Sequence, residues 1–185
     1  MKIGLLFGTF DPIHVGHISI AQSIISRQIV DVIQFVITPT SPDKIKKKIT
    51  SKSHRMNMVD LATENFENMT SSDLEFQLPK PQYTSKTLSM FKRQQPDDEF
   101  IIIMGSDNYI NISKWKNAKY IINNFKICVY NRRGSEPSSY FENTIVLDAI
   151  FFDISSSIIR SDLYGNRQFL SPGVFNYIKS NSIYL

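Results

Sequence analysis

The sequence contains a single cysteine, and this scarcity excludes several kinds of site. One thiol cannot form an internal disulfide or supply a cysteine-rich zinc site. Cys128 stands between apolar neighbours in the run KICVYN, which indicates a buried structural thiol rather than a reactive one. We therefore expect the protein to work in a reducing compartment, the cytoplasm.

Long apolar runs are also missing. No apolar segment approaches the roughly 20 residues that a helix needs to cross a bilayer. The first residues enter a strand-like run without the charged lead and cleavage site of a signal peptide, so we expect neither a signal peptide nor a membrane partner. The 185 residues, of which 42% are hydrophobic, suit one domain over residues 1–185, without internal repeats or linkers.

Acidic residues are outnumbered, with 17 against 21 lysines and arginines, and the formal net charge is +4. The run KIKKK at Lys44–Lys48 supplies much of this excess. A basic surplus suits a phosphate-bearing partner, although a solvated surface loop explains the run equally well. A nucleic-acid interface would need interleaved aromatic residues or a known motif, and neither accompanies the run. We therefore do not expect a nucleic-acid partner.

Apolar runs alternate with segments of helical spacing along the whole chain, and this order indicates the fold class. Strands alternating with helices predict an α/β fold, a Rossmann-like doubly wound parallel sheet with helices on both faces. The predicted strands are Lys2–Phe7, Val32–Thr38, Asp73–Gln77, Phe100–Gly105, Lys126–Asn131, Thr144–Asp148 and Ile150–Ile154. The predicted helices are His17–Gln28, Ser53–Phe66, Ser85–Gln95, Asn117–Phe125, Ser156–Gly165 and Pro172–Asn181.

Chemically distinctive residues follow the predicted strands. In open parallel sheets, ligands bind beyond the carboxyl ends of the strands. We therefore expect a common site built from the segments that follow them. These segments are Gly8–His17, Thr38–Lys48, Gly105–Trp115 and Ser155–Arg160.

The segment GTFDPIHVGH (Gly8–His17) holds two of the three histidines in the chain. Gly8 allows backbone to come close to a ligand, and Gly16 allows tight packing where the helix begins. His14 and His17, three residues apart, would share a face near a helix N-terminus, where an anion is favoured. Their ring nitrogens would then donate to phosphate oxygens. A zinc site and two ordinary histidines are the alternatives at this point.

The segment ISSSIIR (Ile154–Arg160) follows a predicted strand and opens a helix. Its serines can cap the helix, and their hydroxyl and amide groups can donate hydrogen bonds. Arg160 adds a charged fork that suits phosphate oxygens. The alternative is an ordinary helix cap followed by a surface arginine.

These two segments together resemble the signatures of the nucleotidyltransferase superfamily related to class I aminoacyl-tRNA synthetases. GTFDPIHVGH is similar to its T/H-x-G-H element, which binds the triphosphate of ATP or CTP, and ISSSIIR is similar to its ISST-x-IR element, with Ser157 in place of threonine. The resemblance implies catalytic roles for His14, His17 and Arg160. It implies ATP binding by Gly8, Thr9, Phe10, His14, Gly16, His17, Gly105, Asp107, Ser155, Ser156, Ser157 and Arg160.

Two middle segments narrow the resemblance to bacterial nicotinate-nucleotide adenylyltransferases. They are YTSKTL (Tyr83–Leu88) and GSDNYINISKW (Gly105–Trp115). In that family the Tyr-Thr segment and the tryptophan hold the pyridine ring and its carboxylate. The only tryptophan here can stack on a flat cationic ring. The resemblance extends from Lys2 to Tyr177 and implies acceptor binding by Lys44, Tyr83, Thr84, Asp107, Trp115 and Arg132.

Further matches are weaker. SHRMNMVDLA resembles the family's R-x-x-M helix, in which Arg55 would either contact phosphate or extend from the helix surface. YNRRG resembles a family segment that would place Arg132 or Arg133 near the acceptor or the adenine. SPDKIKKK departs from the usual PPHK, because Asp43 stands where histidine is expected. We assign Asp43 no binding role, whereas Lys44 is kept.

The resemblance implies an enzyme that joins nicotinate mononucleotide to the adenylyl group of ATP, releasing pyrophosphate and forming deamido-NAD. The attacking phosphate is already an anion, so it needs no general base. Mg²⁺ is expected to arrive with ATP, so no metal site of the protein itself is predicted. The alternatives are another acceptor such as phosphopantetheine, a cytidylyltransferase, and a non-catalytic nucleotide-binding module. The oligomeric state and the choice between nicotinate and nicotinamide mononucleotide are not predicted.

Overall fold

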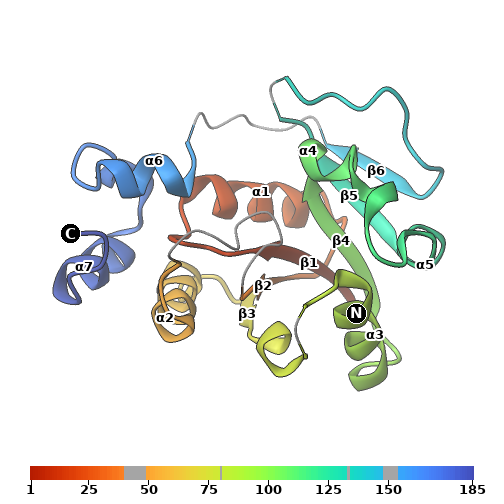
Figure 1. The fold of residues 1–185 in the computed structure, drawn as a ribbon, viewed down its shortest axis with the longest axis horizontal. Coiled ribbons are helices and arrows are strands. Elements are labelled where there is room, and N and C mark those ends of the chain that lie inside the picture. Colours follow the sequence, from red (N-terminus) through yellow and green to blue (C-terminus); the bar gives the residue numbers. More distant parts are fainter. Residues whose placement is uncertain (40–48, 80, 133, 148–153) are drawn as a thin grey trace.

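The computed structural model describes residues 1–39, 49–79, 81–132, 134–147 and 154–185. In this part of the chain one six-stranded sheet has the order β3-β2-β1-β4-β5-β6, and every neighbouring pair is parallel. Helices lie on both sides of the sheet, with α1 and α3 on opposite sides (Figure 1), which confirms the predicted fold class. The strands are β1 (Lys2–Gly8), β2 (Val32–Ile37), β3 (Met69–Ser72), β4 (Glu99–Gly105), β5 (Lys126–Tyr130) and β6 (Thr144–Leu147).

The helices follow the strands in sequence as expected. None of those in the described ranges is long and apolar enough to span a membrane. The α-helices are α1 (Val15–Ser26), α2 (Lys52–Thr63), α3 (Thr84–Gln94), α4 (Ser106–Tyr109), α5 (Ala118–Asn124), α6 (Ser156–Ser161) and α7 (Pro172–Ser180). The short 3₁₀ turns among the described residues are η2 (Leu74–Gln77), η3 (Ile112–Lys114) and η4 (Arg167–Phe169).

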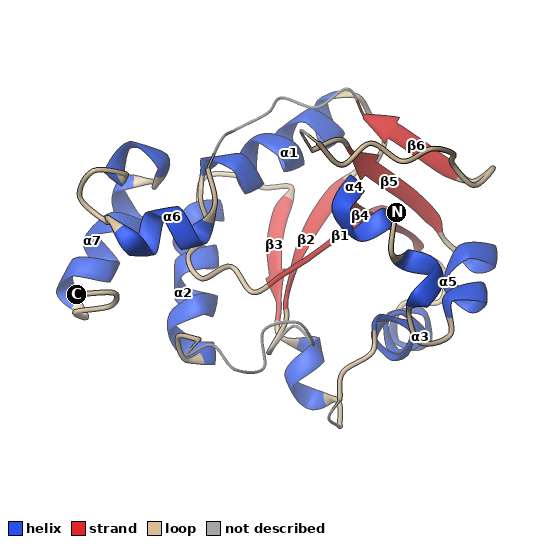
Figure 2. Ribbon diagram, turned by 45° about the horizontal axis from the view of Figure 1, so that its top comes forward, coloured by secondary structure: helices blue, strands red, loops and turns tan. Residues whose placement is uncertain are grey.

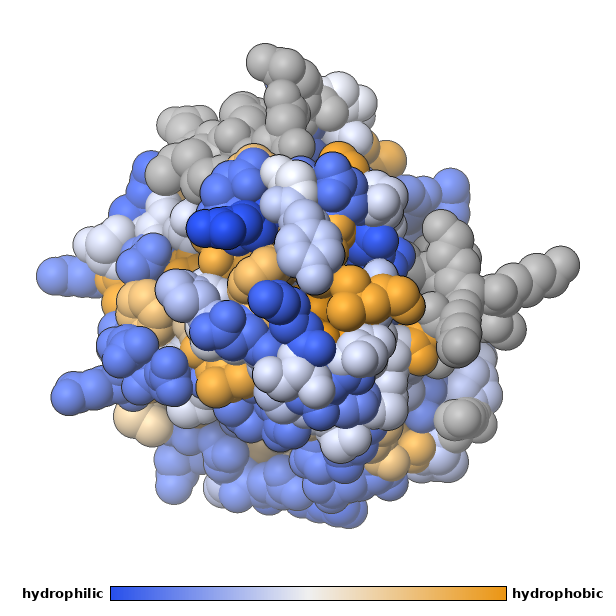
Figure 3. Space-filling view, turned by 90° about the vertical axis from the view of Figure 1, so that its left-hand side faces the viewer, coloured by the Kyte–Doolittle hydropathy of each residue, from blue (hydrophilic) through white to orange (hydrophobic). Residues whose placement is uncertain are grey.

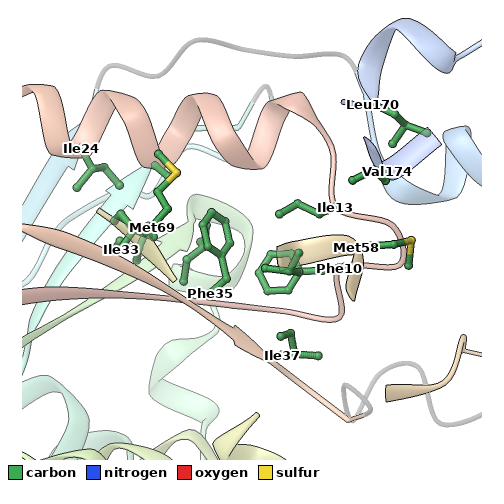
Figure 4. Packing of buried hydrophobic residues seen from close by; sticks show 14 of the residues in the cluster. Phe10, Ile13, Ile24, Ile33, Phe35, Ile37, Met58, Met69, Leu170 and Val174 are labelled. Atoms are coloured by element: carbon green, nitrogen blue, oxygen red, sulfur yellow. The ribbon is translucent and has the colours of Figure 1, made fainter. Parts of the chain in front are cut away.

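The central strands bury both of their faces, which explains their unbroken apolar sequences. In β4, Ile103 packs into a cluster with α1, α2 and α7, whereas its neighbour Ile102 packs into a second cluster with α3 and α5. Figure 4 shows the first cluster, in which Ile24 of α1, Met58 of α2 and Val174 of α7 contribute side chains. Two packed layers of this kind hold the ends of the central strands in fixed positions.

One predicted strand was wrong. Residues 73–77 do not form a strand, because Leu74–Gln77 is a 3₁₀ turn, and the edge strand β3 lies just before it at Met69–Ser72. In the sequence MTSS of this strand only Met69 is fully buried, and the other three residues are polar. An edge strand tolerates this composition because it buries few side chains. The prediction for residues 150–154 lies almost entirely outside the described residues.

The order of the strands creates a crevice at the centre of the sheet. The chain proceeds from β1 to β2 and β3 on one side and then returns to place β4 on the other side of β1. Ligands bind at such a switch point, beyond the carboxyl ends of the strands. The helices α6 and α7 and the C-terminus lie beside α2, at the opposite end of the molecule from β6 (Figure 2).

Candidate active site

A cavity of about 1040 Å³ lies beyond the carboxyl ends of β1, β4 and β5. This volume is at the upper end of the range of ligand clefts. Its wall includes the residues that the sequence predicts for ATP: Gly8, Thr9, Phe10, His14, Gly16, His17, Gly105, Asp107, Ser155, Ser156, Ser157 and Arg160. It also includes five of the six residues predicted for the acceptor: Tyr83, Thr84, Asp107, Trp115 and Arg132. The sixth, Lys44, lies outside the described residues.

The rings of His14 and His17 lie against each other at the start of α1, with their planes tilted by 35°. Their ring centroids are 3.8 Å apart, and the Phe10 ring contacts His17 edge-on at 5.1 Å. The backbone N–H of His14 donates to Nδ1 of His17 at 3.2 Å. Since Nδ1 accepts this bond, neutral His17 carries its proton on Nε2. His17 therefore offers an N–H donor whose tautomer is fixed by the backbone.

His14 is neutral at physiological pH. Its side chain is buried, with 8% of the residue exposed. Burial, with a contribution from the positive charge of Arg132, lowers the pKa of His14 from 6.5 to about 4. Its Nδ1 atom is buried without a well-aligned hydrogen-bond partner in the described ranges. A neutral imidazole can donate only one hydrogen bond, so His14 would act as a dipole and not as a cation.

The low pKa of His14 predicts a loss of stability in acid. The unfolded chain takes up the proton near pH 6.5, whereas the folded protein takes it up only near pH 4. The free energy of unfolding should therefore fall by about 2–3 kcal/mol from this residue between pH 7 and pH 4.5. Urea unfolding of the wild type and of His14→Gln at both pH values measures this contribution. The variant should lose less stability, and equal losses in both proteins would contradict a neutral, buried His14.

The Ser155–Arg160 segment meets the first loop directly. The Ser156 hydroxyl donates to the Pro12 carbonyl at 2.8 Å, and the Arg160 guanidinium donates to the Asp11 carbonyl. Its other terminal nitrogen donates to Oγ of Ser157 at 3.1 Å. The Ser155 side chain caps α6 by accepting from the Ile158 amide. Segments from the two ends of the chain thus line one cavity and are bonded to each other.

Glycines make room for side chains at two strand ends. A Cβ at Gly8 would lie 2.8 Å from the Phe10 ring, so this glycine makes room for Phe10 beside the cavity. A Cβ at Gly105 would lie 2.4 Å from Oδ1 of Asp107 and 2.9 Å from Nε of Arg132. Gly105 therefore allows these two charged side chains to meet over the end of β4.

The end of the cavity with the residues predicted for the acceptor carries a linked pair of charges. Asp107 Oδ2 lies 3.3 Å from Nη1 of Arg132, and Arg132 Nη2 donates to the Tyr130 hydroxyl at 3.2 Å. The other carboxylate oxygen of Asp107 is buried without a hydrogen-bond partner in the described part of the chain. Tyr83 immediately precedes α3, Thr84 is its first residue, and half-buried Trp115 follows the turn η3. An aromatic face, helix amides and a positioned cation therefore surround one end of the cavity.

Sequence reasoning missed Glu75 in the cavity wall. Only 3% of this residue is exposed, and its Oε1 accepts from the Thr87 hydroxyl at 2.9 Å. Burial raises the pKa of Glu75, although the bond from Thr87 opposes the rise. The sequence predicted DLEFQ as a strand and gave Glu75 no role, whereas the 3₁₀ turn Leu74–Gln77 buries this side chain. Lys114 and Lys116 were also missed as lining residues, although they flank Trp115.

Neither interpretation of Arg55 was right. This arginine is 2% exposed, and it donates to the carbonyl oxygens of Thr9, Thr38, Thr50 and Pro39 at 2.8, 2.7, 2.9 and 3.3 Å. Asp11 is also buried, and its carboxylate accepts from the Thr50 amide and from the Tyr184 hydroxyl. Both charged groups bond to the protein itself, and they hold together the loops that flank β1 and β2.

Comparison with known proteins identifies the family. Residues 5–162, most of the chain, match the cytidylyltransferase-like family. A probable nicotinate-nucleotide adenylyltransferase of Flavobacterium johnsoniae is 40% identical, and the match covers 100% of this chain and 99% of that protein. One of Flavobacterium psychrophilum is 38% identical with the same coverage.

A solved structure supports the fold. Plasmodium falciparum nicotinic acid mononucleotide adenylyltransferase complexed with NaAD has a TM-score of 0.79 and 22% identity, covering 99% of this chain and 97% of that chain. At this identity the similarity shows the fold alone. Membership of the family is shown by the family match and by the relatives that align over their full length. This chain therefore belongs to the cytidylyltransferase-like family and, within it, to the nicotinate-nucleotide adenylyltransferases.

Proposed function

We propose that this chain joins nicotinate mononucleotide to the adenylyl group of ATP, forming nicotinate adenine dinucleotide and releasing pyrophosphate. The observation that carries this proposal is one shared cavity, in which donors from both ends of the chain face an aromatic and cationic acceptor end. The relatives that match over their full length are named for this reaction.

The reaction needs positioning more than proton transfer. The phosphate oxygen of the mononucleotide attacks the α-phosphorus of ATP, the bond to the β-phosphate oxygen breaks, and pyrophosphate leaves. The nucleophile is already ionised at neutral pH, so no base has to remove a proton. The enzyme must hold two anions in line and stabilise the charge that builds up on the leaving group.

The phosphate end of the cavity supplies that stabilisation. The Nε2–H of His17 and the guanidinium of Arg160 are the proposed donors to the triphosphate. Each is held by a bond to the protein, from the His14 amide to His17 and from Arg160 to the Asp11 carbonyl. Donors fixed in advance need no reorganisation during the reaction. The hydroxyls of Ser155 and Ser157, the backbone amide of Ser156 and neutral His14 complete this set.

The acceptor end of the cavity offers groups that suit the pyridine ring and the carboxylate of nicotinate mononucleotide. The indole of Trp115 offers a face for the cationic ring, and the amides at the start of α3 offer donors for its carboxylate. Lys114 and Lys116 lie on either side of the tryptophan and line the same cavity. Their charge favours an acceptor with a carboxylate over one with a neutral amide. Lys44 remains a prediction for this end.

We treat magnesium as part of the ATP substrate. Among the described residues, no group of three or more His, Cys, Asp and Glu side chains could hold a metal ion. A cation carried by triphosphate oxygens and water fits this donor set, because Mg²⁺ commonly binds through substrate phosphates. The cytoplasmic location remains an expectation from the sequence.

Pyrophosphate release tests the proposal. The chain is incubated with Mg–ATP and, in separate reactions, nicotinate mononucleotide, nicotinamide mononucleotide or phosphopantetheine, and CTP replaces ATP in a parallel set. We expect turnover with ATP and nicotinate mononucleotide, and at least about tenfold lower kcat/KM with the amide, because one charged contact is lost. Preferred turnover with phosphopantetheine or CTP would overturn the proposed acceptor or donor. No release with any pair would favour a non-catalytic nucleotide-binding protein.

A further inference from the structure

The last residues of the chain return to the loop that forms the phosphate end of the cavity. After α7, the backbone φ angles of Ser182 and Tyr184 are 51° and 66°, so the chain turns sharply. The Ile183 amide donates to the Ile178 carbonyl at 3.0 Å, and its side chain is 7% exposed. This turn brings the Tyr184 hydroxyl to Oδ1 of Asp11, 173 residues away in sequence.

Asp11 is held from two sides. Its carboxylate, in a residue that is 3% exposed, accepts from Tyr184 and from the Thr50 amide at 3.4 Å. Its backbone carbonyl accepts from Arg160, a proposed phosphate ligand. His14 lies three residues further along the same loop. Any shift of Asp11 would therefore move the partner of one phosphate donor and the segment that carries two others.

The surroundings of Tyr184 preserve its role as a donor. Burial, reinforced by the negative charge of Asp11, raises the pKa of the Tyr184 hydroxyl, so the hydroxyl stays protonated at physiological pH. The last residue, Leu185, is 67% exposed. Figure 3 shows the end of the molecule that carries α6 and α7, where hydrophilic side chains cover most of the surface. The bond to Asp11 thus lies beneath an exposed chain end.

We propose that Tyr184 is a positioning residue for ATP, acting through Asp11 on the loop that carries His14 and His17. The side chain is not among the residues that line the cavity. Its hydroxyl holds the buried carboxylate of Asp11 in place. Asp11 in turn holds the loop that positions the proposed phosphate donors. This inference rests on the proposed function only in that the cavity binds ATP, and it does not depend on the identity of the acceptor.

The packing of the loop supports this route. Phe10 and Ile13, on either side of Asp11 and Pro12, pack in the same cluster as Met58 of α2 and Val174 of α7 (Figure 4). The apolar contacts hold the loop against the core at two points. The polar group between them, the Asp11 carboxylate, still needs donors, because an under-bonded buried carboxylate is costly. Tyr184 supplies one of the two described donors.

The variant Tyr184→Phe removes the hydroxyl and keeps the ring. We expect the dissociation constant of Mg–ATP, measured by calorimetry on the intact chain, to rise about tenfold, the change typical of one weakened charged hydrogen bond. The dissociation constant of nicotinate mononucleotide alone should stay near the wild-type value. Circular dichroism and thermal unfolding establish that the variant is folded at the temperature of the measurement.

Tyr177→Phe is the matched control. Its hydroxyl also belongs to the C-terminal region, but it bonds to His54 at 2.9 Å and to Asn57 at 2.8 Å, both on α2. We expect this control to lower stability without weakening ATP binding. Deleting Leu185 should leave ATP binding intact, whereas deleting residues 184–185 should weaken it as Tyr184→Phe does.

The outcomes separate the two proposals. If the wild type binds ATP and Tyr184→Phe binds it equally well, the positioning role is overturned and the proposed function stands. If both tyrosine variants weaken ATP binding equally, Tyr184 has only a structural role and the inference fails. If the wild type binds no ATP, both proposals fail. If it binds ATP but uses another acceptor, the acceptor assignment fails while the role of Tyr184 is still measured by the same titration.

Discussion

His17→Ala should lower kcat by about 10²–10³-fold, the usual cost of losing one well-aimed donor to a developing charge. The His14 amide fixes the tautomer of His17, and the Phe10 ring fixes its orientation. The donor is therefore in place before ATP binds, and alanine supplies nothing instead. Steady-state pyrophosphate release at saturating ATP and nicotinate mononucleotide measures the loss. A variant with near-normal turnover would remove His17 from the catalytic residues.

The control for this result is His54→Ala. His54 is the third histidine of the chain, and it lies on α2, where its ring bonds to Tyr177 and is not part of the cavity wall. Its loss should leave kcat close to the wild-type value. His17→Gln, which keeps an N–H donor of similar reach, should recover part of the activity that His17→Ala loses. Equal losses for His54→Ala and His17→Ala would point to a general defect in folding.

Arg55→Met should lower the free energy of unfolding by about 3–5 kcal/mol, the range seen when one member of a buried charged network is removed. Methionine keeps much of the apolar stem but donates to none of the four carbonyl oxygens that Arg55 serves. Those oxygens lie on the loops after β1 and β2 and just before α2. The loss would also remove one positive charge near the buried Asp11 carboxylate. Urea unfolding monitored by circular dichroism measures the change.

Two further substitutions test the reason for this effect. Arg55→Lys keeps the charge but cannot reach several carbonyls at once, so its loss of stability should be intermediate. Arg93→Met removes an exposed arginine from the last turn of α3 and should change stability by less than about 0.5 kcal/mol. If Arg55→Met were as mild as Arg93→Met, Arg55 would not be the link between the loops that the structure describes.

The order of strands and helices was readable from the sequence because it depends on local pattern. The strand around Ile102 is apolar on both faces, and the Pro172 helix has a serine cap, so each carries its own signal. The edge strand Met69–Ser72 carries none, because only Met69 is fully buried and the three residues after it are polar. The neighbouring LEFQ was mistaken for a strand because its alternation also fits a short turn with one side buried.

The candidate site was readable where residue type and loop position coincide. The two histidines and the Ser155–Arg160 segment follow strands predicted from the sequence, and the structure brings them to one cavity. Their individual roles stay predictions. Buried Glu75 gave no signal in the sequence. Arg55 was noticed as part of a motif, but its backbone carbonyl partners were not predicted, because they depend on distant segments. The bond from Tyr184 to Asp11 is of the same kind, since only the folded chain brings these residues together.

A crystal structure of the chain with a non-hydrolysable ATP analogue and Mg²⁺ is the most direct test of the proposal that loops from both ends of the chain bind one triphosphate. It should show phosphate oxygens of a single analogue within about 2.7–3.2 Å of both His17 Nε2 and the Arg160 guanidinium. If the triphosphate contacts only one of these groups, or lies outside the cavity between them, the proposed arrangement is wrong.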